Sequence, residues 1–343
     1  MKARTSYLSR CALWLAGSVL VLVVVAELVS RFVLGLGTPP LYEADAGFEY
    51  RLLPNQDVRR FGNHIQVNRW GMRSPDFGNT KTDPQELRVM VFGDSVVNGG
   101  SQIDQAALST SLLQSALQTQ MVRPVTVGNI SAGSWGPGNW LAYADRFGFF
   151  EADVVVLVVG SGDHADNPVF APLDADHPSQ APTLALQEAV LRYLPRYLNH
   201  YLPEALGGLW KEPSEGTTAT RETNLQDRAR GQADLQQFLQ LAQGRQRHAI
   251  VLHHPDLDEL TSGSYADGHA QMQALVQGMS LPFVELRTVY QAAGSKLYRD
   301  NIHHSAQGQQ VMAGALLDAV LKHLPIQRAE PVDVANAAQG SRP

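Results

Sequence analysis

The chain has 343 residues, enough for one large domain or two ordinary ones, so it can bury a sizeable core. Charged residues make up only 17% of the sequence, below the ~25% of a typical soluble domain, which suggests that part of the chain faces lipid. The 27 Lys and Arg against 33 Asp and Glu give a net charge of −6 without a basic stripe, which argues against nucleic-acid binding. The single cysteine, Cys11, excludes an internal disulfide and a multi-cysteine metal site.

An apolar segment near the N-terminus predicts a membrane-spanning helix. Residues 11–26 carry no charge, and the apolar pattern continues to Leu36. Glu27 and Arg31 interrupt it at a spacing that allows them to pair across one helical turn. At a rise of 1.5 Å per residue, such a helix can cross a hydrocarbon core of ~30 Å.

The flanking charges predict the orientation of this helix. Lys2, Arg4 and Arg10 precede it, and basic residues favour the cytoplasmic side. We therefore expect residues 1–37 to be a cytoplasmic N-terminus and inner-membrane anchor, with the remaining chain periplasmic. Cleavage of a signal peptide after Ala26 is the alternative, which the apolar sequence beyond that residue disfavours.

Residues 38–86 predict a small extended β subdomain and linker. The segment contains several prolines, which disfavour helix. Residues 58–61 and 64–67 have the pattern of two short strands, and Gly62-Asn63 between them suggests a hairpin turn.

Residues 87–325 predict an α/β domain, because short apolar runs alternate with helical patterns. A run such as Val154–Val159, with six consecutive apolar residues, is typical of a strand buried on both faces. Such alternation implies a doubly wound parallel sheet with right-handed crossovers. The expected strands are 89–92, 125–127, 154–159, 249–252 and 283–286, and the expected helices lie near 106–120, 139–149, 265–279 and 312–324.

Two further segments lack this alternation. Residues 165–247 are expected to form an insertion, in which Tyr193, Tyr197 and Tyr201 have helical spacing and suit packing with neighbouring leucines or stacking on sugar rings. The tail, 326–343, has no periodicity and is expected to be disordered.

Candidate catalytic residues lie at the two ends of this α/β domain. The first strand runs directly into Gly93-Asp94-Ser95, which places a hydroxyl at the carboxyl edge of the sheet, where sites of such folds lie. Before the last helix, Asp300 and His303 have a D-x-x-H spacing that can bring a carboxylate beside one ring nitrogen. The other ring nitrogen could then accept the serine proton.

These two motifs resemble those of the GDSL, or SGNH, hydrolases, and the resemblance covers roughly residues 87–324. It implies a flavodoxin-like five-stranded fold, with Ser95 as nucleophile, His303 as base and Asp300 as its orienting carboxylate. It also implies an oxyanion hole made by the Ser95 backbone N–H and a second N–H from Gly133 or Ser134.

The third block of the family departs from its pattern in this chain. It reads Gly160 to Asp163, with Gly162 where the family has an asparagine that donates to the oxyanion. Loss of one such donor costs about 3 kcal/mol of transition-state stabilisation. The Gly162 backbone N–H, or the side chain of His164 or Asn167, could replace it, or catalysis is slow.

The resemblance implies an ester hydrolase with no cofactor, acting on acetyl esters of an extracellular carbohydrate or on a small ester. An O-acetyltransferase for an exopolysaccharide would use the same triad. A non-catalytic carbohydrate-binding or scaffold protein of a polysaccharide-export assembly is a further alternative, with assembly proteins as partners.

Other motifs point to weaker alternatives. Gly160 to Ala165 fits a dinucleotide fingerprint but is followed by Pro168 and not by a helix. The histidines lack a close metal-ligand spacing, so no metal site is expected. His253 and His254, at the end of the fourth strand, are expected to face the rim of the site or solvent.

Overall fold

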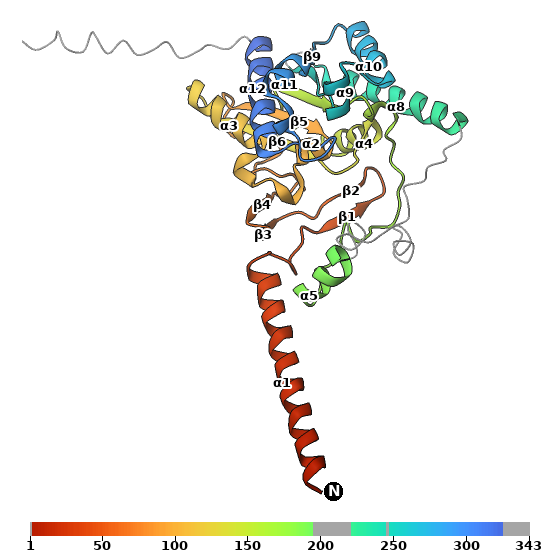
Figure 1. Ribbon diagram of the computed structural model, residues 1–343. Coiled ribbons are helices and arrows are strands. Elements are labelled where there is room, and N and C mark those ends of the chain that lie inside the picture. The colour runs from red at the N-terminus through yellow and green to blue at the C-terminus, as the bar shows by residue number, and fades with distance from the viewer. Residues whose placement is uncertain (1, 195–220, 245–246, 325–343) are drawn as a thin grey trace, which may run out of the picture.

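The structure is a computed structural model that describes residues 2–194, 221–244 and 247–324. An N-terminal helix extends like a stalk from an α/β body (Figure 1). The tail expected to be disordered lies outside the described residues, as do Tyr197 and Tyr201.

The stalk is α1 (Lys2–Phe32). Over Cys11–Phe32 it is long and apolar enough to cross a membrane, and this part is not buried in the body. Arg31 Nη2 lies 2.8 Å from Glu27 Oε1, which confirms the expected pairing across one turn. The helix thus meets the requirements of a membrane span in length and composition, while its orientation stays a prediction.

Two small antiparallel hairpins follow α1. They are β1 (Tyr42–Asp45) with β2 (Glu49–Leu52), and β3 (Gln56–Arg60) with β4 (Asn63–Val67). The expected second hairpin is confirmed, but its turn residues are Phe61 and Gly62, with φ of 51° and 81°. Positive φ at both positions is what a tight two-residue hairpin turn requires. The turn therefore lies one residue earlier than the Gly-Asn dipeptide suggested.

The body contains the expected five-stranded parallel sheet. Its strands are β5 (Leu87–Gly93), β6 (Val125–Ser131), β7 (Val154–Val159), β8 (His248–His253) and β9 (Phe283–Glu285). The spatial order is β6-β5-β7-β8-β9, with parallel pairing throughout. This is the flavodoxin-like order, in which the direction of winding reverses at the first strand. The expected doubly wound fold is confirmed.

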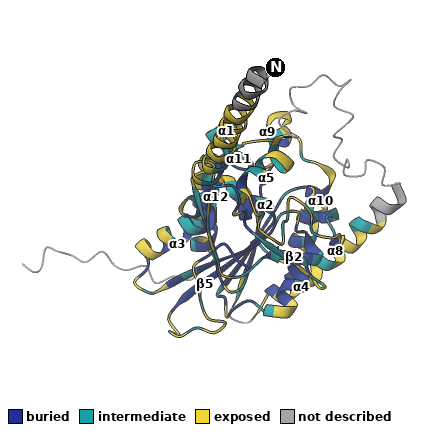
Figure 2. Ribbon diagram, turned by 90° about the horizontal axis from the view of Figure 1, so that it is seen from below, coloured by how far each residue is buried: buried dark blue, intermediate teal, exposed yellow. Residues whose placement is uncertain are grey.

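Helices cover both faces of this sheet. The described α-helices of the body are α2 (Ser95–Asn98), α3 (Ser109–Gln120), α4 (Pro137–Phe147), α5 (Ala185–Glu188), α8 (Arg221–Ala242), α9 (Leu257–Ser262), α10 (Asp267–Gly278), α11 (Arg287–Ala293) and α12 (Ala306–His323). In Figure 2 the buried strands lie between α3 and α12 on one side and α4 and α8 on the other.

Successive side chains of a strand point to opposite faces of the sheet, which explains why helices pack on both faces. Val154, Val156 and Val158 pack toward α3 and α12, while Val155 and Leu157 pack toward α4 and α8. Both sets are buried, as expected for a strand with six consecutive apolar residues.

The crossover from β7 to β8 differs from the sequence expectation. Its helix, α8, lies within the region expected as an insertion, and its C-terminal half is part of the core. Leu235, Phe238, Leu239 and Ala242 are all buried there against α4 and the sheet. The insertion proper is therefore shorter than residues 165–247, because its last part completes the α/β alternation.

Candidate active site

Ser95 lies where β5 turns into the short helix α2. The Asp94 carboxylate accepts the Val96 N–H at 2.8 Å and caps this helix. A Cβ on Gly93 would come within 2.4 Å of Val97 Cγ2, so the turn needs glycine at that position. Together these residues hold the Ser95 side chain, which is half-buried, at the carboxyl edge of the sheet.

His303 and Asp300 come from the loop before α12 and meet Ser95. His303 Nε2 lies 3.0 Å from Ser95 Oγ, and His303 Nδ1 lies 2.8 Å from Asp300 Oδ2. The other carboxylate oxygen of Asp300 accepts the backbone N–H groups of Ile302 and His303, at 2.9 and 2.7 Å. The structure therefore brings the three predicted side chains into one hydrogen-bonded chain.

The environment of Asp300 keeps its carboxyl group ionised. Desolvation raises its pKa, but the backbone N–H groups of His303 and Ile302 and the His303 ring outweigh this effect and hold it below the usual value. An ionised carboxylate on Nδ1 fixes the ring tautomer that leaves Nε2 free to accept a proton. His303 is over one-third exposed, so the dyad is open to substrate.

A buried glutamine positions these elements, and sequence reasoning missed it. Gln309 of α12 donates to Val96 O at 2.7 Å and accepts the Ser109 N–H at 2.8 Å. It thereby links the helix that follows His303 to the helix that carries Ser95. The sequence signal for this residue was its position. Gln309 lies one helical turn before Met312, and Met312 is the first residue of the apolar stripe that marks the last helix.

Gly133 and Ser134 follow the neighbouring strand, β6. Gly93 and Ser131 are paired in register, so Ser95 and Gly133 each lie two residues beyond the ends of adjacent strands. The Tyr50 hydroxyl donates to Gly133 O, which fixes this segment against the β1–β2 hairpin. The predicted oxyanion segment is therefore at the same edge of the sheet as the nucleophile.

Gly162 and Asp163 follow β7, on the other side of β5. Gly162 is exposed, with φ −76° and ψ −28°, and no atom lies within 4 Å of the position of a Cβ. Asp163 Oδ2 accepts the Gly160 N–H at 2.8 Å. Desolvation of the Asp163 carboxyl, and then the nearby charge of Asp94, raises its pKa well above the usual value.

Two of the candidate replacements for the family asparagine are engaged elsewhere. His164 Nδ1 lies 3.0 Å from Ser161 O, and its ring packs against Gly268 of α10. Asn167 Nδ2 donates to Ala165 O and, at 2.8 Å, to Asp227 O. Burial lowers the pKa of His164, and the neutral ring gives its one N–H to Ser161 O, while both amide N–H groups of Asn167 have partners. Neither side chain has a free N–H for an oxyanion, so the backbone N–H of Gly162 is the remaining donor, or the reaction is slow.

The expectation for His253 and His254 is wrong, because both are buried and face neither the rim nor solvent. His253 packs among Tyr265, His269 and Phe283, and burial lowers its pKa to about 2. His254 lies beneath the site, with its ring 3.4 Å from the position of a Cβ on Gly160. The strand ends here, but the rings of Tyr265, His269 and Phe283 cover His253, and the ring of His304 lies against His254.

A second D-x-x-H motif lies beside the oxyanion segment, and sequence reasoning missed it. Asp174 Oδ1 accepts the Asp176 and His177 backbone N–H groups at 2.9 Å and lies 3.0 Å from His177 Nδ1. The His177 ring contacts those of Tyr42 and Tyr50, and its Nε2 is 3.7 Å from the position of a Cβ on Gly133. Asp174 and His177 have the same D-x-x-H spacing as Asp300 and His303, and this repeat was the sequence signal for the second motif.

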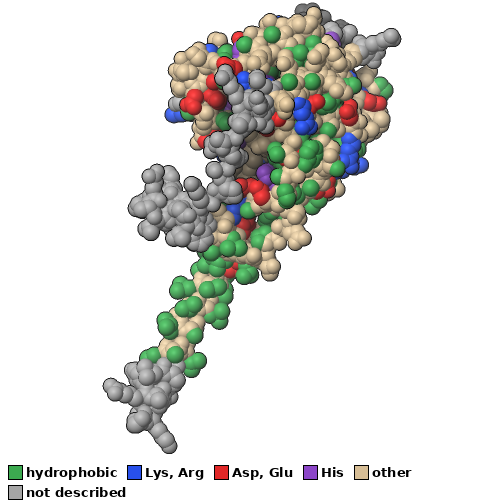
Figure 3. Space-filling view, turned by 90° about the vertical axis from the view of Figure 1, so that its right-hand side faces the viewer, with side chains coloured by type: hydrophobic (Ala, Val, Ile, Leu, Met, Phe, Trp, Pro, Cys, Tyr) green, Lys and Arg blue, Asp and Glu red, His purple; other side chains and the backbone are tan. Residues whose placement is uncertain are grey.

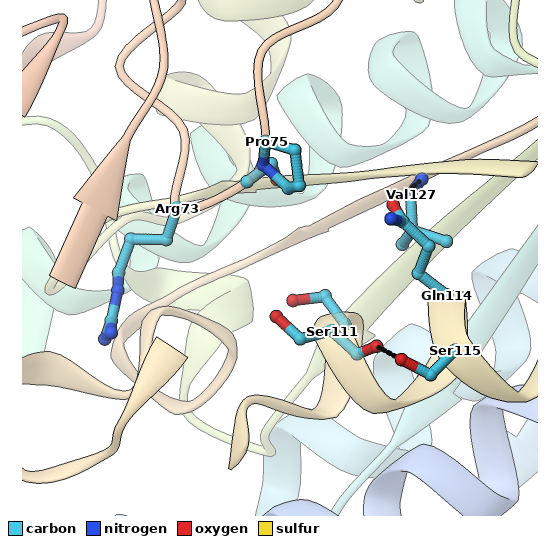
Figure 4. A pocket seen from close by; sticks show the side chains of 8 residues that line it. Arg73, Pro75, Ser111, Gln114, Ser115 and Val127 are labelled. Carbon is cyan, nitrogen blue, oxygen red and sulfur yellow. Dashed lines mark hydrogen bonds between the residues drawn. The ribbon is translucent and has the colours of Figure 1, made fainter. Parts of the chain in front are cut away.

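A separate pocket lies between residues 73–75 and α3 and contains none of the triad (Figure 4). The guanidinium of Arg73 is turned away from the hydroxyls of Ser111 and Ser115 and donates to backbone carbonyls such as Asn98 O at 2.9 Å. In the described part of the chain, no three His, Cys, Asp or Glu side chains gather into a group that could hold a metal ion.

No family model matches the sequence, and neither does any curated protein. Solved structures with a similar fold include an acetyl xylan esterase from Geobacillus stearothermophilus, at 13% identity and a TM-score of 0.41 over 71% of this chain and 97% of that one. A lipase/acylhydrolase from Enterococcus faecalis is also 13% identical, with a TM-score of 0.39 over 71% and 100%. A protein from Desulfitobacterium hafniense, assigned as lipolytic and of the G-D-S-L family, is 11% identical, with a TM-score of 0.35 over 67% and 98%. These three structures are thus of esterases and lipolytic proteins, at low identity.

Proposed function

We propose that the protein is an ester hydrolase that forms an acyl-enzyme on Ser95. The observation that carries this proposal is the hydrogen-bonded chain from Ser95 Oγ through His303 to Asp300. His303 Nε2 takes the hydroxyl proton as Oγ attacks the ester carbonyl, and it then gives this proton to the departing alcohol. Water attacks the acyl-enzyme in the same way, so that the carboxylic acid leaves and Ser95 regains its proton.

The negative charge that develops on the carbonyl oxygen needs hydrogen-bond donors at the sheet edge. We assign this role to the backbone N–H groups of Ser95, of Gly133 or Ser134, and of Gly162, which follow three adjacent strands. A backbone donor at Gly162 is less directed than the family asparagine, so we expect a modest hydrolysis rate.

The substrate proposed here is an acetyl ester on an extracellular carbohydrate. The open position of His303 suits a polymer that cannot enter a deep pocket. His177 and the Tyr50 hydroxyl lie beside Gly133, and the partly exposed rings of Tyr42 and His177 offer aromatic surface for a sugar ring. A sugar hydroxyl in place of water would turn the same acyl-enzyme into an acyltransferase.

Fluorophosphonate labelling of the full chain in detergent tests the nucleophile. We expect labelling of the wild type and of the control Ser111→Ala, whose serine lies in the separate pocket, and its loss in Ser95→Ala. Hydrolysis of p-nitrophenyl acetate should follow the same pattern. Absence of labelling, or labelling that persists in Ser95→Ala, would show that Ser95 is not the nucleophile.

An acetylated polysaccharide then tests the substrate class and the acceptor. Release of free acetate that requires Ser95 supports the hydrolase. Movement of acetyl groups onto an unacetylated polymer without acetate release would assign the transferase instead.

A further inference from the structure

We propose that residues 184–194 form a second membrane contact, a short helix that lies in the bilayer interface beside α1. This juxtamembrane helix comprises α5 and a π-helical turn, Ala189–Tyr193. Its outer face exposes Leu184, Val190, Leu191 and Leu194, with 51, 44, 68 and 43% of each residue accessible. An apolar face on a short helix next to a span is the pattern of an interfacial segment.

Hydrogen bonds from the end of α1 fix the position of the juxtamembrane helix along the axis of α1. Glu27 Oε1 accepts the Ala185 N–H at 3.0 Å, and Glu27 Oε2 accepts the Leu186 N–H at 2.8 Å. The carboxylate thus satisfies two donors at the start of the juxtamembrane helix, which would otherwise lack partners. Because Glu27 follows directly on the uncharged stretch of α1, the helix begins at the level where that stretch ends.

A buried ion pair fixes the rotation of the juxtamembrane helix. Glu188 pairs with Arg60 of β3, and both side chains are at most 5% exposed. Glu188 also accepts the Gly37 N–H at 2.7 Å, and Arg60 donates to the Tyr193 hydroxyl at 2.7 Å. Breaking a buried pair leaves an unpaired charge, so this arrangement resists rotation of the helix. The polar residues therefore face the body, and the leucines face outward.

Lipid is the occupant that best fits this outward face, because the face continues the exposed apolar surface of α1. Phe32, the last residue of α1, and Val33, which follows it, are 76 and 68% exposed. Figure 1 shows α5 as the part of the body beside the upper turns of α1, and Figure 3 shows hydrophobic side chains continuing from α1 onto the base of the body. A contact of this kind would hold the body close to the bilayer. The segment that precedes the juxtamembrane helix reaches the active site. In it, Pro178 O accepts the Tyr42 N–H, and His177 lies beside Gly133 of the oxyanion segment.

Depth-dependent fluorescence quenching of the full chain in lipid vesicles tests this contact. In a Cys11→Ser background, single cysteines at Leu191, Phe32 and Val122 would carry an environment-sensitive dye. Phe32 is the positive reference in α1, and Val122, which is 84% exposed on the loop before β6, is the matched negative control. Lipids brominated near the headgroup end of the acyl chain supply the quencher.

We expect the dye at Leu191 to be quenched several-fold more than the dye at Val122 and to approach the value at Phe32. If the dye at Phe32 is quenched but the dye at Leu191 is quenched no more than the dye at Val122, the proposal is overturned. The apolar face would then be a candidate contact for another protein. If the dye at Phe32 also escapes quenching, the span and the second contact both fail. Neither result bears on Ser95, because covalent labelling of the serine is measured separately.

Discussion

Replacement of Gly162 by asparagine would test whether the site lacks an oxyanion donor. The backbone at Gly162 has helical φ and ψ, which any residue adopts, and the position of a Cβ is open. The side chain therefore enters without strain. Because glycine has more freedom in the unfolded chain, stability should be unchanged or rise by about 0.4–1 kcal/mol.

The gain in rate can be bounded from the effect of deleting such donors. Removing one oxyanion donor costs about 10²–10³-fold in kcat, equal to about 2.7–4 kcal/mol. Gly162 is exposed, so solvent competes with the new amide and the gain should lie at the lower end of this scale. We expect Gly162→Asn to raise kcat for p-nitrophenyl acetate by up to ~100-fold. KM should change little, because the donor acts on the transition state.

The matched control is Gly162→Ala, which makes the same change in the backbone without supplying a donor. Initial rates of the full chain over a range of substrate concentrations would separate kcat from KM. A stably folded Gly162→Asn that is no faster than Gly162→Ala would refute the reasoning. It would show that the hole is already complete or that the site is not built for ester hydrolysis.

Four further substitutions test the site and its surroundings. Asp300→Asn removes the carboxylate that fixes the His303 tautomer, so kcat should fall by about 10²–10⁴-fold; a loss below about tenfold would contradict the assigned role. The pKa of the Asp163 carboxyl is raised in the folded protein, so its deprotonation destabilises the fold. The stability that the protonated form contributes is lost as the pH rises from the usual aspartate pKa to the pKa in the folded protein. Asp163→Asn should therefore raise the unfolding temperature at neutral pH and have no effect below about pH 4; equal shifts at both pH values would refute this. Gly231→Ala in α8 should lower the free energy of unfolding by about 1–3 kcal/mol, because its Cβ would lie 2.2 Å from a backbone oxygen. Gly314→Ala in α12, where the position of a Cβ is open, should raise it by about 0.5–1 kcal/mol; urea titrations that give the two variants the same sign would contradict the packing argument.

Local interactions made several features predictable from the sequence. The run Val154–Val159 is apolar on both sides of the chain, and only a strand covered on both faces buries such a run. The Asp300 carboxylate is bound by N–H groups two and three residues later, so the D-x-x-H spacing alone sets the geometry of the dyad. The meeting of Ser95 with His303 also followed, because parallel strands place their carboxyl ends at one edge.

Other features depended on partners that are distant in the sequence. The hydrogen bond from Asn167 to Asp227 O and the packing of His164 against Gly268 arise only when α8 and α10 pack beside the third strand. His253 and His254 have the sequence of a strand end, but rings from α10, β9 and two loops cover them. The raised pKa of Asp163 likewise requires burial and a second carboxyl from another strand end.

The helix α8 shows that secondary structure, too, was only partly predictable from the local sequence. Its apolar residues Leu235, Phe238, Leu239 and Ala242 have helical spacing, but they follow a long polar stretch that hides the pattern. The sequence determined which segments need to be buried and which short motifs set their own geometry. The tertiary structure decided which polar groups have partners, because hydrogen bonds and burial between distant segments exist only after the sheet and its helices have assembled.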